Sequence, residues 1–101
     1  MFTVKKLNNH INNFLFELKE NNFHIQKAIL FGSYANGKVH ENSDIDLAIW
    51  ADEFDSKKDN LDKIKSVLSK YYPISPKLYG LNENDDPFIE IIHKTGKTIK
   101  I

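Results

Sequence analysis

The chain has 101 residues, which is enough for one modest hydrophobic core, so we expect a single domain over residues 1–101. Its net charge is zero, which argues against general binding to nucleic acid or membrane surfaces. The chain has no cysteine, which excludes disulfides and thiolate metal sites. It also has no apolar run of about 18 residues, and we therefore expect a cytoplasmic protein. All fourteen basic residues are lysines, so the chain has no guanidinium group that could hold a phosphate through two parallel hydrogen bonds.

The first predicted element is an amphipathic helix that begins after Thr3 and ends at Asn21-Asn22. Threonine is a typical N-cap residue, and asparagine tolerates the left-handed backbone that often ends a helix. Apolar residues recur at helical spacing between these ends, at Val4, Leu7, Ile11, Phe14, Leu15 and Leu18. Such a stripe packs into a core, and we assign it no catalytic role.

Two short apolar runs, over residues 25–31 and 44–50, predict strands that are buried on both faces. Between the runs we expect a turn at Gly32-Ser33, a short helix that ends at Gly37, and a polar loop.

The next predicted elements are a long helix and a third strand. Ser56 and Asp59 resemble a capping box at the start of the helix, and Pro73 stops it. The buried stripe of this helix comprises Leu61, Ile64, Val67, Leu68 and Tyr71. The third strand, over residues 74–81, contains Pro76 and therefore belongs at a sheet edge or an irregular position.

The chain closes with a last helix and a short strand over residues 98–101. Asp86 is the expected N-cap of the helix, Pro87 its first residue and Gly96 its end. Its buried part is expected to comprise Phe88, Ile89, Ile91 and Ile92. Alternating helices and strands predict an α/β (α+β) domain with a small mixed sheet of about four strands packed by helices.

The residues that can carry chemistry stand between the first two strands. Gly32 allows a tight turn, and the N–H groups that open the following helix at Ser33 favour an anion. On the second strand Asp44 and Asp46 point to the same face, about 6.6 Å apart at Cα, so their carboxylates can hold divalent cations about 3.5–4 Å apart. A phosphate cradle beside paired carboxylates is what nucleotidyl transfer requires.

The sequence Gly32-Ser33, ten residues and then Asp44-x-Asp46 resembles the nucleotidyltransferases related to DNA polymerase β. At this length the chain is most similar to minimal nucleotidyltransferase (MNT) proteins, which are often antitoxin partners of HEPN ribonuclease toxins. The resemblance implies that Gly32 and Ser33 contact the β- and γ-phosphates of ATP or another nucleoside triphosphate. It also implies that Asp44 and Asp46 are catalytic and hold two Mg²⁺ ions during in-line attack on the α-phosphate.

Two positions depart from the pattern of that family. Asn36 stands where the family often has arginine, so the turn loses a positive charge. The family's third carboxylate, on the next strand and facing the pair, would fall at Ser75, and serine replaces neither a metal ligand nor a base. Glu83, Asp85 and Asp86 are nearby in sequence, but we interpret them as loop and cap residues.

The sequence leaves alternative functions open. The intact glycine–serine turn and aspartate pair favour an enzyme, and the resemblance implies that it transfers AMP from ATP to a protein acceptor, a HEPN toxin encoded beside it. Ser75 favours a catalytically degenerate module that binds nucleotide, or only its protein partner. Nucleotidylation of an antibiotic or another small molecule is disfavoured, because such enzymes usually carry a further helical domain.

Overall fold

Helices and strands alternate in the computed structural model. The structure describes residues 3–55, 57–82 and 86–101, and for residues 55 and 57–61 it describes the backbone alone. The elements are α1 (Val4–Glu20), β1 (Ile25–Phe31), α2 (Ser33–Asn36), β2 (Ile45–Ala51), the 3₁₀ turn η1 (Asp52–Asp55), α3 (Lys57–Leu68), β3 (Ile74–Tyr79), α4 (Phe88–Thr95) and β4 (Lys97–Ile99). None of the described helices is long and apolar enough to cross a lipid bilayer.

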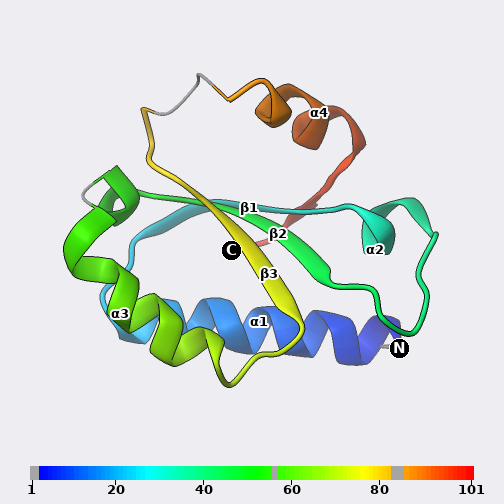
Figure 1. The fold of residues 1–101 in the computed structure, drawn as a ribbon, viewed down its shortest axis with the longest axis horizontal. Helices are drawn as coiled ribbons and strands as arrows, with labels where there is room; N and C mark the ends of the chain where they lie inside the picture. The colour runs from blue at the N-terminus through cyan, green and yellow to red at the C-terminus, as the bar shows by residue number, and fades with distance from the viewer. Residues whose placement is uncertain (1–2, 56, 83–85) are drawn as a thin grey trace.

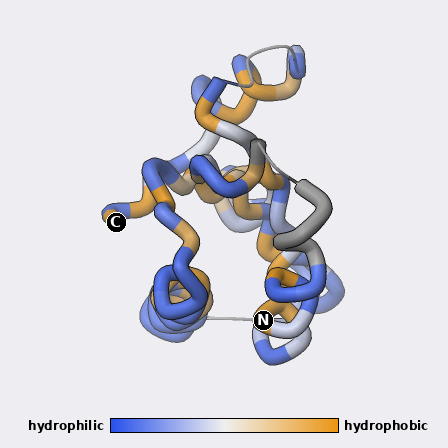
Figure 2. The backbone as a smooth tube through the Cα atoms, turned by 90° about the vertical axis from the view of Figure 1, so that its left-hand side faces the viewer, coloured by the Kyte–Doolittle hydropathy of each residue, from blue (hydrophilic) through white to orange (hydrophobic). Residues whose placement is uncertain are grey.

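The four strands form one mixed sheet in the order β3-β2-β1-β4 (Figure 1). Strand β1 pairs antiparallel with β2 and with β4, whereas β3 lies parallel to β2. Helices α1 and α3 lie on one side of the sheet and α4 on the other (Figures 1 and 2). The predicted mixed sheet packed by helices is therefore confirmed, and Pro76 lies on an edge strand as expected.

Side-chain alternation along β2 divides the hydrophobic core between the two faces of the sheet. Ile45, Leu47 and Ile49 are fully buried in the larger cluster, together with the residues of α1 and α3. Ala48 and Trp50 point the other way and belong to a smaller cluster that Ile92 of α4 covers. The face under α4 is the one that Asp46 shares, so the smaller cluster positions the candidate site.

Helix α1 begins and ends where the sequence predicts. Thr3 Oγ1 accepts a hydrogen bond of 3.2 Å from the N–H of Lys6, and Asn22 adopts a left-handed φ of 69° just after the helix. The predicted stripe is buried from Leu7 to Leu18, whereas Val4 in the first turn is exposed.

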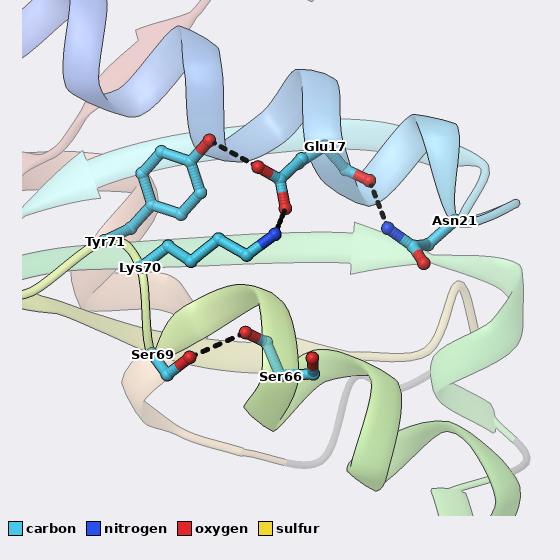
Figure 3. A network of polar contacts seen from close by, with 6 residues as sticks. All are labelled: Glu17, Asn21, Ser66, Ser69, Lys70 and Tyr71. Atoms are coloured by element: carbon cyan, nitrogen blue, oxygen red, sulfur yellow. Dashed lines mark hydrogen bonds and ion pairs between the residues drawn. The ribbon is translucent and has the colours of Figure 1, made fainter.

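One carboxylate joins the end of α1 to the segment that follows α3 (Figure 3). Glu17 accepts hydrogen bonds from Lys70 Nζ and from the Tyr71 hydroxyl, each 2.9 Å long. Lys70 first, and then Tyr71, lower the pKa of Glu17 below its ordinary value. This contact links α1 to the segment after α3, on the face of the sheet opposite the candidate site.

Replacing Phe14 of α1 with alanine should lower the free energy of unfolding by about 3–5 kcal/mol. The Phe14 side chain is 0% exposed, and its ring centroid lies 5.6 Å from that of Tyr71, so truncation leaves a cavity in the larger cluster. Urea unfolding followed by circular dichroism measures the change. Phe16→Ala on the same helix is the matched control; Phe16 is 62% exposed, so a loss of similar size there would contradict the cavity argument.

Several boundaries differ from those expected. Strand β2 begins one residue after Asp44, and β3 ends at Tyr79 rather than at residue 81. Helix α3 ends at Leu68, before Pro73, because a hydrogen-bonded turn follows it. Ile64, Val67, Leu68 and Tyr71 are buried or partly buried as predicted. The side chain of Leu61 and the proposed capping box of Ser56 and Asp59 lie outside the described residues.

The expectation for the last helix is wrong in two respects. Ile92 is fully buried and Ile89 partly buried, but Phe88 and Ile91 are 40% and 52% exposed. The reason is geometric: α4 is a short helix that contacts the sheet through Ile89 and Ile92, and residues 88 and 91 lie around the helix from that contact. The helix also begins one residue later than expected, at Phe88 with Pro87 as its N-cap, although Asp86 Oδ1 accepts a 2.9 Å hydrogen bond from the N–H of Phe88.

Candidate functional site

The four predicted site residues meet at one end of the sheet. Strand β1 ends at Phe31 and α2 begins at Ser33, so Gly32 is the residue that turns the chain. Phe31 is the register partner of Asp46 on β2, which places the second aspartate beside this turn. Asp44 stands just before β2 and is close enough for its charge to act on Asp46.

Gly32 adopts a conformation that glycine alone adopts readily, with φ 70° and ψ −149°. A Cβ atom at this position would collide with Oδ2 of Asp46 and would lie 3.1 Å from its Cγ. The bare backbone of the turn therefore lies directly against the carboxylate. This close approach explains why the sequence needs glycine here for more than its dihedral freedom.

The two aspartates form a site of concentrated negative charge. Burial, and then the like charge of Asp44, raise the pKa of Asp46 above its ordinary value. Among the lysine side chains that the structure describes, none forms an ion pair with either carboxylate. A cation would relieve this repulsion, and carboxylate oxygens are the ligands that Mg²⁺ prefers, so the residues present fit a hard divalent ion.

Ser75 lies next to Asp46 on the neighbouring strand. The two residues are partners in the parallel register of β2 and β3, so their side chains point to the same face of the sheet. The described part of the chain contains no group of three histidine, cysteine, aspartate or glutamate side chains placed to hold a metal ion. Asp86 is engaged by Lys77 and Tyr79, while Glu83 and Asp85 lie outside the described residues.

A pocket of about 350 Å³ opens beside Asp46, between the end of β1 and α4. Its polar lining includes the turn and the second aspartate, whereas its apolar walls come from β1 and from α4. The lining residues are Phe31, Gly32, Asn36, Asp46, Phe88, Ile91, Ile92 and Thr95. The pocket thus joins the predicted motif to a helix that lies far from it in the sequence.

A model of the family described as "Polymerase beta, Nucleotidyltransferase" matches residues 11–101. The chain belongs to this family. The matched range includes the Gly32 turn, both aspartates, Ser75 and the whole of α4. Among curated proteins, none matches the chain.

Three solved structures that resemble this chain are described as toxin–antitoxin structures. A chain of a toxin–antitoxin structure with AMP-PNP is 28% identical, with a TM-score of 0.58, over 85% of this chain and 69% of the matched one. Chains from two mutant forms of the toxin–antitoxin pair MntA-HpeT are 26% and 25% identical. Their TM-scores are 0.54 and 0.59, covering 86% and 88% of this chain and 69% and 70% of theirs. This member of the nucleotidyltransferase family therefore resembles members of toxin–antitoxin pairs.

The sequence predicted the glycine–serine turn and the aspartate pair but not the other wall of the pocket. We expected Phe88 and Ile91 to be buried, because apolar residues in a short helix usually pack into the core. The available signal was the breadth of the apolar surface: Ile89 and Ile92 already suffice for contact with the sheet, and Phe88 and Ile91 widen that surface beyond one stripe.

Proposed function

We propose that this protein is the antitoxin of a toxin–antitoxin pair and a Mg²⁺-dependent nucleotidyltransferase. It would bind ATP, or another nucleoside triphosphate, and transfer AMP to its HEPN-type partner protein. The observation that carries this proposal is the close approach of the Gly32 turn to Asp46 in a chain of the nucleotidyltransferase family. Support also comes from the similar toxin–antitoxin structures, one of which contains the ATP analogue AMP-PNP.

Each site residue has a role in this proposal. The backbone at Gly32 and Ser33 would contact the β- and γ-phosphates, because the absence of a side chain at Gly32 leaves its amide accessible. Asp44 and Asp46 would hold Mg²⁺, which supplies the positive charge at the phosphates that no arginine in this chain can supply. A hydroxyl of the partner would attack the α-phosphate, and pyrophosphate would leave.

Ser75 favours a second function for the same site. In the register of the sheet this serine lies beside Asp46, and its neutral hydroxyl neither holds a metal ion as a carboxylate does nor accepts a proton from an attacking hydroxyl. The chain would then bind nucleotide, or only its partner, and neutralise the toxin by contact. This second function requires the same fold and the same interface with the partner, but no nucleotidyl transfer.

One experiment distinguishes the two functions. The chain is mixed with ATP labelled at the α-phosphate, Mg²⁺ and the purified HEPN-type protein encoded beside it. Label that becomes covalently attached to the partner supports the transferase. A stable complex without label, seen by size-exclusion chromatography, supports the binding module. The absence of both a labelled partner and a stable complex would contradict both proposals.

Gly32→Ala should weaken Mg²⁺–ATP binding by at least about tenfold, whereas Gly37→Ala should leave it nearly unchanged. Both glycines have positive φ, so both variants strain the backbone. At Gly37 the added methyl group meets nothing within 4 Å, but at Gly32 it displaces the Asp46 carboxylate. Calorimetric titration of the two variants gives the comparison, and equal ATP affinity would place the phosphate cradle elsewhere.

A further inference from the structure

We propose that the pocket between the end of β1 and α4 holds the base and ribose of the bound nucleotide, with Phe88 and Ile91 as the apolar surface against which the base packs. This inference rests on the proposed function, because it places the nucleoside half of the same nucleoside triphosphate. It goes further by assigning a ligand-binding role to α4, which lies outside the glycine–serine and aspartate motif.

The pocket lies directly next to the candidate phosphate and metal site. Gly32 and Asp46 belong to its lining, so a ligand with its phosphates at this turn has the pocket beside them. A volume of about 350 Å³ lies at the lower end of the range of about 300–1,000 Å³ for small-molecule sites. A single nucleoside is a ligand of the size that such a space admits.

The chemistry of the walls suits a base better than a phosphate. Phe31, Phe88 and Ile91 present rings and an aliphatic side chain, and burying a phosphate against them would remove its charge from water without a partner. The flat face of a nucleobase, in contrast, gains from contact with aromatic and apolar side chains. The charged half of the ligand therefore belongs at the turn and the aromatic half at α4.

The surface of α4 divides into a face on the sheet, a face toward solvent and a face on the pocket. Ile89 and Ile92 pack on the sheet, while Glu90 and Lys94 form an ion pair of 3.3 Å on the solvent side. The third face carries Phe88 and Ile91, with Ile92 and Thr95 continuing it at the i, i+3, i+4 and i+7 spacing of one helical stripe. This third face lines the pocket, which gives its exposed apolar side chains a reason to be there.

Contacts around Phe88 hold its ring at the edge of the pocket. The ring meets Phe31 edge-on, with 5.8 Å between centroids and an angle of 66° between the planes. Lys77 Nζ lies 5.3 Å from the centre of the same ring, and Asp86 caps the N–H of Phe88. A ring held in this way loses little conformational freedom when a base packs against it.

The test compares ATP with inorganic tripolyphosphate, which has the phosphates but no nucleoside. Binding of each to the full chain is measured by calorimetry with Mg²⁺. Phe88→Ala should weaken ATP binding by about tenfold and leave tripolyphosphate binding unchanged, because base–aromatic contact alone is lost. Phe88→Tyr keeps the ring and should keep the ATP affinity. Phe16→Ala, which removes an exposed ring of α1, is the control for general surface effects.

The other outcomes are equally informative. Unchanged ATP binding in Phe88→Ala, or an equal loss for ATP and tripolyphosphate, would overturn the subsite and leave the proposed function intact. Failure of the unmodified chain to bind either ligand would overturn both. If Phe88→Ala proves unfolded by circular dichroism, Ile91→Ser decides, because Ile91 is 52% exposed and its replacement spares the core. A selective loss of ATP affinity in Ile91→Ser supports the subsite, and no loss overturns it.

Discussion

Replacing Asp44 and Asp46 together with asparagine should abolish Mg²⁺-dependent ATP binding while the chain stays folded. Asparagine keeps the shape of aspartate but removes both negative charges that would hold the ion. The loss of Mg²⁺–ATP affinity should exceed about 10–100-fold, which is the loss that removal of an outer-shell partner of a metal site typically causes. Stability should be unchanged or higher, because burial and the neighbouring charge already disfavour the ionised form of Asp46 and raise its pKa.

Calorimetry with and without Mg²⁺ measures the binding, and urea unfolding measures the stability. The matched control replaces two exposed aspartates away from the site, Asp52→Asn with Asp62→Asn, and changes the net charge by the same amount. Equal nucleotide affinity in the site variant and the unmodified chain would contradict the assignment of Asp44 and Asp46 as metal ligands.

Ser75→Glu should raise the rate of nucleotidyl transfer by about 10²–10⁴-fold, the usual contribution of a general base. The register partner of Asp46 is the position from which a third carboxylate would face the pair, and glutamate there supplies a ligand and a proton acceptor. The unmodified protein should accordingly be a slow or inactive transferase that still binds its partner.

Ser75→Gln is the matched control for this substitution, because it has nearly the shape of glutamate without the charge. The rate of label transfer from α-labelled ATP to the partner is measured for both variants and for Ser75→Ala. Rapid transfer by the unmodified chain, unaffected by Ser75→Ala, would show that no third acid is needed. Equal rates for the glutamate and glutamine variants would exclude a role for the charge.

Local chemistry allowed the elements near the site to be predicted well. The bounds of β1 and α2 agree with the structure, because a glycine that needs a positive φ stands at the junction and a second such glycine ends the short helix. Thr3 and Asn22 mark the ends of α1 for the same reason, since each satisfies a local backbone requirement. The signals are weaker for residues 56 to 82, and there the ends of α3 and β3 were missed.

The sequence by itself determined the motif: a turn glycine, a helix start and two aspartates two residues apart, all properties of residues close together in the chain. Only the tertiary structure decided what surrounds them. That Asp46 lies between Phe31 and Ser75 follows from the strand order and register, which pair residues many positions apart and depend on the whole core. Phe88 and Ile91 became walls of a pocket because α4 rests on the sheet by one side, and no local pattern specifies which side that is.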